Sequence, residues 1–230
     1  MALSLRPLRR EDFALLSQWL SQPHVEPWWR EDHDPESIER RYGPSVDRAD
    51  RTQMLIVERD GSPVAFVQLY LLDDNPDWKR ALASAGAYDN AAGIDYLIGD
   101  EGAIGKGLGP QIIDSLTEMA WQCYPGVLEV VAAVQQDNRR SWRALEKAGF
   151  DRAWTGDIRS EDPSDNGPSY VYMRRRTAAA PAQPVPAQPV PAQPALAQPA
   201  GNRPAGSHLT AAKPPEAQPA GPQPAKASNR

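Results

Sequence analysis

The stretch GIDYLIGDEGAIGKGLG, residues 93–109, joins an apolar segment to a turn rich in glycine, and an apolar run with helical spacing follows it. The turn closes with Gly105, Lys106, Gly107, Leu108 and Gly109. A glycine turn that enters a helix presents free backbone amides to phosphate oxygens. The spacing fits neither the P-loop, which needs Ser or Thr after Gly-Lys, nor the GxGxxG dinucleotide fingerprint. We therefore expect a diphosphate site of another kind.

Asp95 stands on the apolar segment just before this turn, next to Ile94 and close to Leu97 and Ile98. An unpaired carboxylate among such neighbours costs free energy, so we expect Asp95 to have either a compensating contact or a chemical role. The contact would be a hydrogen bond to a nearby loop amide. The chemical role would follow because a carboxylate can bind an ammonium group and accept or relay its proton.

Periodicity and turn residues predict the elements that hold these groups. We expect strands or strand pairs at residues 3–8, 54–72, 92–98, 127–134 and 169–175, and helices at residues 11–20, 35–42, 108–122 and 138–150. Asp60-Gly61 is the expected hairpin turn, and Gly149 ends the last helix. Residues 24–32, with two tryptophans, and residues 73–90 are expected to be loops. This order predicts an α+β domain with a central mixed sheet.

Composition separates a tail from this domain. Of 24 prolines, 13 lie after Arg176, where large apolar residues are almost absent. Such a segment buries too little surface to offset the entropy of ordering. We therefore predict a folded domain at residues 1–176 and a disordered Pro/Ala/Gln-rich tail at 177–230, which could make a weak protein contact. Deleting residues 180–230 should leave activity intact.

Charge follows the same boundary. The chain carries −5 and residues 177–230 carry +3, which leaves −8 on residues 1–176. An acidic domain is a poor partner for nucleic acid and suits a cationic ligand, although mild acidity also serves solubility. No signal peptide and no run of about 20 apolar residues is present, so we expect a cytoplasmic protein without membrane contact.

The single cysteine and the two histidines near the N-terminus do not indicate a catalytic or metal site. Cys123 is the single cysteine and has no histidine in a catalytic motif beside it, so neither a disulfide nor a thiol nucleophile is expected. His24 and His33 lack a third ligand nearby, and we interpret them as surface residues. No metal is expected.

Taken together, the strand, the GKGLG turn, the helix, the next strand, and Asn138 with LEKAGF resemble the Gcn5-related N-acetyltransferase (GNAT) superfamily. WLSQPHVEPWW, GSPVAFVQLY and GIDYLIGDEGAIGKGLG resemble, more narrowly, the aminoglycoside 6′-N-acetyltransferases. The likeness runs from about residue 5 to residue 175. Siderophore lysine N-acyltransferases share parts of the pattern. The resemblance implies the GNAT fold, with a twisted, mostly antiparallel sheet flanked by helices.

For the co-substrate, the resemblance implies acetyl-CoA. Its diphosphate would lie on the amides from Ile104 to Gly109, and its pantetheine arm would pair with the strand edge at Leu97 and Ile98. Asn138 matches a position near the pantetheine, and it can also cap the helix that follows.

For the amine, the resemblance implies that Asp95 is the base. The residues that match substrate-lining positions are Asp77, Trp78, Tyr42, Gln68, Tyr70 and one of Trp28 and Trp29. Aromatic faces suit amino sugars through stacking and cation–π contact. Plain core packing is the alternative, and we expect it for at least one of the two tryptophans.

Three positions depart from the family pattern. Leu145 stands where many members have a tyrosine proposed to protonate the departing thiolate. Ala133 and Asn166, beside Asp165, stand where two further substrate-binding aspartates are expected. We therefore expect fewer anionic contacts to a polycationic drug, and a thiolate that another group or water protonates or that leaves unassisted.

These residues predict acetyl-CoA-dependent N-acetylation of a primary amine, most simply the 6′-amine of an aminoglycoside, by a monomer or homodimer. One alternative is acylation of a lysine-derived siderophore precursor. The other is a binding protein that sequesters aminoglycosides or acyl-CoA without turnover.

Overall fold

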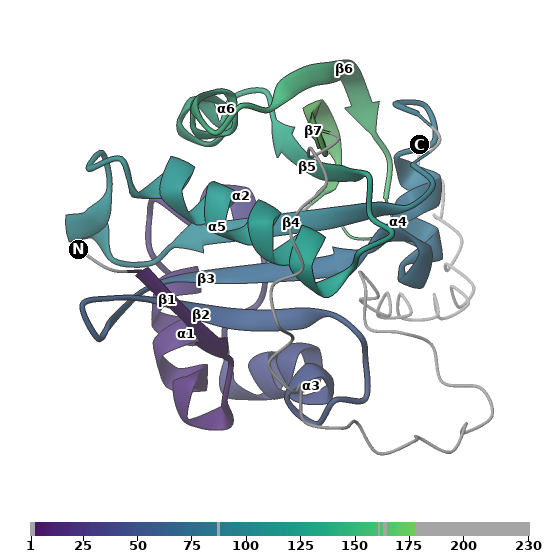
Figure 1. The fold of residues 1–230 in the computed structure, drawn as a ribbon. Coiled ribbons are helices and arrows are strands. Elements are labelled where there is room, and N and C mark those ends of the chain that lie inside the picture. The colour runs from purple at the N-terminus through teal and green to yellow at the C-terminus, as the bar shows by residue number, and fades with distance from the viewer. Residues whose placement is uncertain (1–2, 87, 161, 163–164, 178–230) are drawn as a thin grey trace, which may run out of the picture.

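The computed structural model describes residues 3–86, 88–160, 162 and 165–177 (Figure 1). One seven-stranded sheet organises them, in the order β1-β2-β3-β4-β5-β7-β6. The strands are β1 Leu3–Pro7, β2 Gln53–Arg59, β3 Ser62–Leu71, β4 Ala91–Ile98, β5 Glu129–Gln135, β6 Asp151–Ile158 and β7 Gly167–Arg175. All neighbours are antiparallel except β4 and β5. The expected mixed, mostly antiparallel α+β sheet is confirmed.

One face of the first four strands is covered by α1 Phe13–Leu20 and α3 Pro35–Val46. Strands alternate their side chains between faces, and here Met54 and Ile56 of β2 pack with Leu16 of α1 and Ile38 of α3. The β2–β3 hairpin turns at Asp60-Gly61 with φ of 51° and 80°. Positive φ at both positions is what a tight hairpin turn needs, so this prediction is confirmed.

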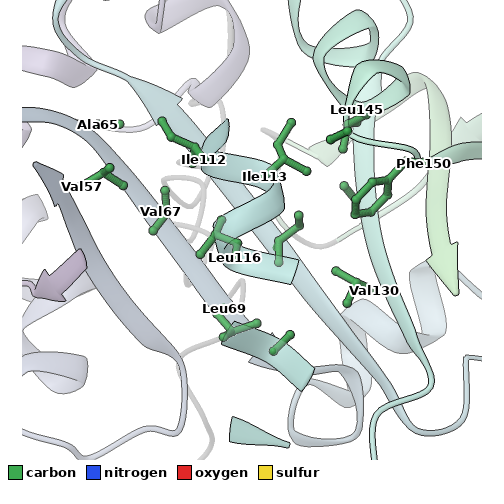
Figure 2. Close-up of a cluster of buried hydrophobic side chains, with 14 of the residues drawn as sticks. Val57, Ala65, Val67, Leu69, Ile112, Ile113, Leu116, Val130, Leu145 and Phe150 are labelled. Atoms are coloured by element: carbon green, nitrogen blue, oxygen red, sulfur yellow. The ribbon is translucent and has the colours of Figure 1, made fainter. Parts of the chain in front are cut away.

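The opposite face is covered by α5 Leu108–Cys123 and α6 Arg139–Lys147. The apolar stripe expected for α5 is the buried one, and Figure 2 shows Ile112, Ile113 and Leu116 between the hairpin strands and Val130 of β5. Leu145 joins α6 to this cluster, and Gly149 follows α6 with φ of 77°. The two helices are therefore fixed to the sheet by one continuous apolar core.

The contact between β4 and β5 is short. The two parallel strands pair only at Ala91–Glu129, Ala92–Val130 and Gly93–Val131. β5 goes on to pair with β7 up to Gln135, and β4 goes on to pair with β3 up to Ile98. Among the described residues, Ile94–Ile98 therefore has no strand on its β5 side, and the sheet opens beside Asp95.

Two segments expected to be loops contain short helices, so these two predictions are wrong. The expected loop at 24–32 contains the helical turn α2 Glu26–Trp29, with Pro27 in its first turn, where proline is tolerated. The expected loop at 73–90 contains η2 Leu72–Asp74 and α4 Pro76–Ala81. Short 3-10 segments also precede α1 (η1 Arg10–Asp12) and α5 (η3 Glu101–Ala103). The predicted disorder of 177–230 concerns residues that, Thr177 aside, lie outside the described part.

Across the described residues, no helix has the length and apolar character that a membrane span requires.

Candidate active site

Asp95 lies at the open end of β4, on the face that carries α1 and α3. In the β3–β4 register it stands opposite Gln68, and Tyr70 stands opposite Gly93. A Cβ on Gly93 would come within 2.2 Å of the Tyr70 ring, so the ring lies directly over that glycine. The absence of a side chain at Gly93 is what lets Tyr70 lean along the sheet toward Asp95.

Two side chains on the same face act on the Asp95 carboxylate. Tyr70 interacts with Asp95, and Trp78 interacts in turn with Tyr70. Burial and the neighbouring carboxylate raise the pKa of Tyr70 well above its usual value, so it stays a donor. Gln68, Tyr70 and Trp78, three of the expected site residues, are thus gathered around Asp95.

A buried ion network lies beside these residues. Arg41 of α3 bridges Glu31 (Nη2 to Oε1, 2.9 Å) and Asp162 (Nη1 to Oδ2, 3.1 Å). The side chains of Glu31 and Asp162 are only 4% and 1% exposed. The Tyr42 hydroxyl donates to the other oxygen of Glu31. One arginine thus links the segment after α2, the helix α3 and the segment between β6 and β7.

Asp95 and Asp165 feel the charges of this network and of each other. Burial is the main cause that raises the pKa of Asp95 to about 6, that of Glu31 to about 7 and that of Asp165 to about 8. Four carboxyl groups share a single guanidinium, which leaves a net charge of −3 when all are ionised. This group of Glu31, Arg41, Asp95, Asp162 and Asp165 is called the acidic cluster below. Its negative potential favours a cation.

The remaining expected lining residues divide between core and surface. Tyr42 is fully buried and packs edge-on against Phe66, and Trp29 also packs edge-on against Phe66, at 5.7 Å between centroids. Core packing therefore accounts for Trp29, as expected for one of the pair. Trp28 is partly buried, and its carbonyl accepts from the Gln135 side chain at the end of β5. The Asp77 carboxylate pairs with Arg80 on the same helix.

The glycine turn has the conformation that its composition demands. Gly105 and Gly107 have φ of 75° and 76°, and an added Cβ on either would meet nothing within 4 Å. Gly107 begins α5 without a side-chain cap, so the first amides of that helix have no acceptor within it. Leu108 is buried, and an added Cβ on Gly109 would lie 3.1 Å from Ala144 of α6. Gly109 therefore serves helix packing.

Neighbouring positions complete this side. The Asn138 side chain accepts from the Ser141 amide at 3.2 Å and caps α6, which confirms the capping interpretation. Leu97 is buried against α1 and α3. The carbonyl of Ile98 contacts His24 Nε2 at 2.9 Å, so His24 is partly buried and not the surface residue we expected.

The structure places the three positions that depart from the family pattern. Leu145 is fully buried in the apolar core, and Ala133 is partly buried on β5. Asn166 accepts a hydrogen bond from the Ser160 amide at 2.6 Å. Asp165 and Asp162, however, lie in the acidic cluster, so the segment between β6 and β7 supplies carboxyl groups after all. Within the described ranges no three His, Cys, Asp or Glu side chains are placed so that they could hold a metal ion, and Cys123 is exposed.

Sequence reasoning missed Glu31, Arg41 and Asp162 as members of the site. Arg41 follows Ser37 by four positions and precedes the inward-facing Tyr42, which places it at the edge of the buried helix face. That edge position was the available signal. Glu31 and Asp162 lie in polar segments, where nothing local marks a buried carboxylate.

Known proteins share the sequence pattern of this chain. A family model for the acetyltransferase (GNAT) domain matches residues 9–158. Aminoglycoside N(6′)-acetyltransferase type 1 from Klebsiella pneumoniae is 29% identical over 181 residues, covering 77% of this chain and 85% of the relative, and that from Serratia marcescens gives the same values. A kanamycin resistance protein from Rhizobium radiobacter is 31% identical over 86 residues, covering 37% and 73%.

Solved structures of an aminoglycoside acetyltransferase have a similar fold. A crystal structure of the aminoglycoside acetyltransferase AAC(6′)-Ib with coenzyme A and kanamycin is 27% identical, with a TM-score of 0.61, covering 76% of this chain and 95% of that one. The same enzyme with ribostamycin and coenzyme A is 26% identical, with a TM-score of 0.62 and coverage of 76% and 94%.

Proposed function

Because this chain belongs to the GNAT acetyltransferase family, we propose that it transfers the acetyl group of acetyl-CoA to a primary amine, the 6′-amine of an aminoglycoside. The observation that carries this proposal is the acidic cluster beside the open edge of β4. A polycationic amine is the ligand that such a potential favours, and Asp95 is the member of the cluster on the strand edge itself.

The residues present fit the co-substrate. The exposed turn Ile104–Gly107 and the first amides of α5 offer donors and a helix N-terminus to a diphosphate. The stretch Ile94–Leu97 offers backbone groups to the amide-containing pantetheine arm, in the manner of an added strand, whereas the Ile98 carbonyl already contacts His24. Asn138 stands across this opening at the start of α6. Acetyl-CoA, when bound, supplies an acyl carbon joined to a good leaving group.

The chain's own residues provide the rest of the mechanism. Asp95 holds the incoming ammonium and accepts its proton, directly or through water, so that a neutral nitrogen attacks the thioester carbon. Tyr70, which interacts with the Asp95 carboxylate, helps to keep it oriented. Backbone amides near Leu97 polarise the thioester carbonyl, and Asp165 holds a further ammonium group of the substrate.

Thiol release tests the function directly. We expect free coenzyme A to appear from acetyl-CoA when an aminoglycoside with an amine at the 6′ position is added. A matched aminoglycoside that differs only by a hydroxyl at that position should give none. N6-hydroxylysine with long-chain acyl-CoA belongs in the same panel, since turnover there would favour the siderophore alternative. Drug binding without any thiol release would favour the sequestering protein.

The turn at Gly107 can be tested through affinity. Alanine has no favourable left-handed conformation, and the cost is about 1–2 kcal/mol. Gly107→Ala should therefore bind coenzyme A roughly tenfold more weakly by calorimetry, because the turn must return to the glycine conformation to bind. Gly126→Ala is the matched control, since its Cβ also meets nothing and its φ is ordinary. Equal affinity of the two variants would remove the turn from the binding site.

The tail stays outside this proposal. We expect a chain truncated after Ala179 to keep the kcat and KM of the full-length protein, because every residue of the acidic cluster and of the glycine turn precedes residue 180. Steady-state kinetics on both chains, with matched concentrations from absorbance, check this. A large loss of turnover would assign the proline-rich tail a part in activity.

A further inference from the structure

Tyr96 carries the only hydroxyl on the unpaired stretch of β4. Asp95 and Tyr96 are consecutive, so their side chains project from opposite faces of the sheet. Asp95 faces the α1 and α3 side with Gln68, whereas Tyr96 packs with the core beneath α5 and α6. A base and a hydroxyl therefore flank the same opening from its two sides.

The Tyr96 hydroxyl crosses the opening to the first turn of α6. Its Oη donates to the Ser141 carbonyl oxygen at 3.1 Å and lies 2.7 Å from Ser141 Oγ. Ser141 is in turn held by Asn138, whose Oδ1 accepts from the Ser141 amide. The serine hydroxyl can donate to Tyr96, and when the phenol O–H rotates away from the Ser141 carbonyl oxygen its proton can be given to a third group. The pair thus has the contacts of a proton donor with its own support.

The phenol is also kept in the protonated form. Burial and the nearby charge of Asp95 raise the pKa of Tyr96 above its ordinary value. The Tyr96 side chain is partly buried. One turn along α6 from Ser141, position 145 is a fully buried leucine and offers no hydroxyl.

We propose that Tyr96 is the general acid that protonates the sulfur of the departing coenzyme A, with Ser141 as its positioning residue. This inference rests on the proposed acetyl transfer. It assigns the two proton transfers to neighbouring residues of one strand: the amine approaches on the Asp95 side, and the thiol departs on the Tyr96 side.

The step balances. The ammonium gives one proton to Asp95 before attack, and Asp95 passes it to solvent. The nitrogen loses a second proton, also to solvent, as the amide forms. The carbon–sulfur bond breaks with its electron pair on sulfur, and the Tyr96 O–H proton moves to that sulfur. Ser141 donates to the resulting phenolate until solvent returns a proton. One proton is released overall for each amide formed.

Removing the hydroxyl tests the assignment. Tyr96→Phe keeps the ring in the core, so we expect kcat to fall about 100-fold. The KM values of both substrates should stay within threefold of wild type, and the unfolding midpoint should stay within error. Tyr124→Phe is the matched control, because that hydroxyl accepts from Gln53 away from the opening, and it should be unchanged. A kcat for Tyr96→Phe within threefold of wild type overturns the proposal, as does tighter coenzyme A binding with no loss of kcat.

A second measurement separates chemistry from support. Incorporating 3-fluorotyrosine at position 96 changes the acidity of the phenol with almost no change in size. We expect kcat to change with that acidity at position 96 and to stay constant when the same residue is placed at 124. Constant kcat at both positions contradicts the acid role. If the wild-type protein itself releases no thiol with any amine, the proposed function fails instead.

Discussion

Asp95→Asn should lower kcat for acetyl transfer about 1,000-fold at pH 7.5, within the range expected when a positioned base is removed. Asparagine keeps the shape and can still interact with Tyr70, so the surrounding packing survives. It cannot take a proton from an ammonium group. Coenzyme A affinity, measured by calorimetry, should stay the same, because the glycine turn and the start of α6 are untouched.

Wild-type activity should also depend on pH in a way that this variant lacks. Asp95 must be ionised to act as a base, and burial raises its pKa to about 6, so kcat/KM should rise as pH increases through that value. Glu31 and Asp165, with pKa values near 7 and 8, are coupled to it, and the rise should extend to about pH 8. A pH–rate profile from 5 to 9 measures this rise in the wild-type protein.

Asp114→Asn provides the matched control for the amide substitution. This aspartate is exposed and pairs with Arg174 on the far side of α5, so kinetics and pH profile should equal those of the wild-type protein. If Asp95→Asn turns over within a few-fold of wild type at neutral pH, another group is the base and the assignment of Asp95 is wrong.

Much of the fold could be predicted because its signals are local. The Asp60-Gly61 turn between two apolar runs defines the hairpin, and the apolar stripe of α5 determines which face of that helix is buried. The short helix α2 and the helix α4 were missed for the opposite reason. Each has one or two turns and a proline in its first turn, so neither reaches the length at which periodicity can be detected.

The site could be predicted only in part, for a similar reason. Asp95, Gln68 and Tyr70 lie on apolar runs that predict strands, and their shared face follows from the register. Glu31 and Asp162 are 131 positions apart in the sequence and meet only because both reach Arg41. No local sequence pattern predicts that Glu31 and Asp162 contact the same arginine. The expectation of a weaker anionic site from Ala133 and Asn166 did not foresee carboxyl groups supplied by the segment before β7.

Arg41→Met should destabilise the protein by about 3–5 kcal/mol at pH 8, the cost of removing one partner from a buried ion network. Methionine fills the space of the arginine stem but leaves Glu31 and Asp162 buried without their shared cation. Urea unfolding followed by fluorescence measures the loss. Arg10→Met is the control: Arg10 also bridges two carboxylates, Glu39 and Asp47, but all three side chains are about half exposed, so the midpoint should hardly move.

The loss in Arg41→Met should shrink as pH falls. A carboxyl whose pKa is raised by folding contributes most stability below its unfolded value and loses that contribution as pH rises through its folded value. For Glu31 these values are 4.5 and about 7 with Arg41 present, and removing the cation raises the folded value further. At pH 5 the buried carboxyls take up protons at little cost, whereas at pH 8 they cannot. A loss independent of pH would mean that Arg41 acts through packing alone and that the acidic cluster does not hold its charge.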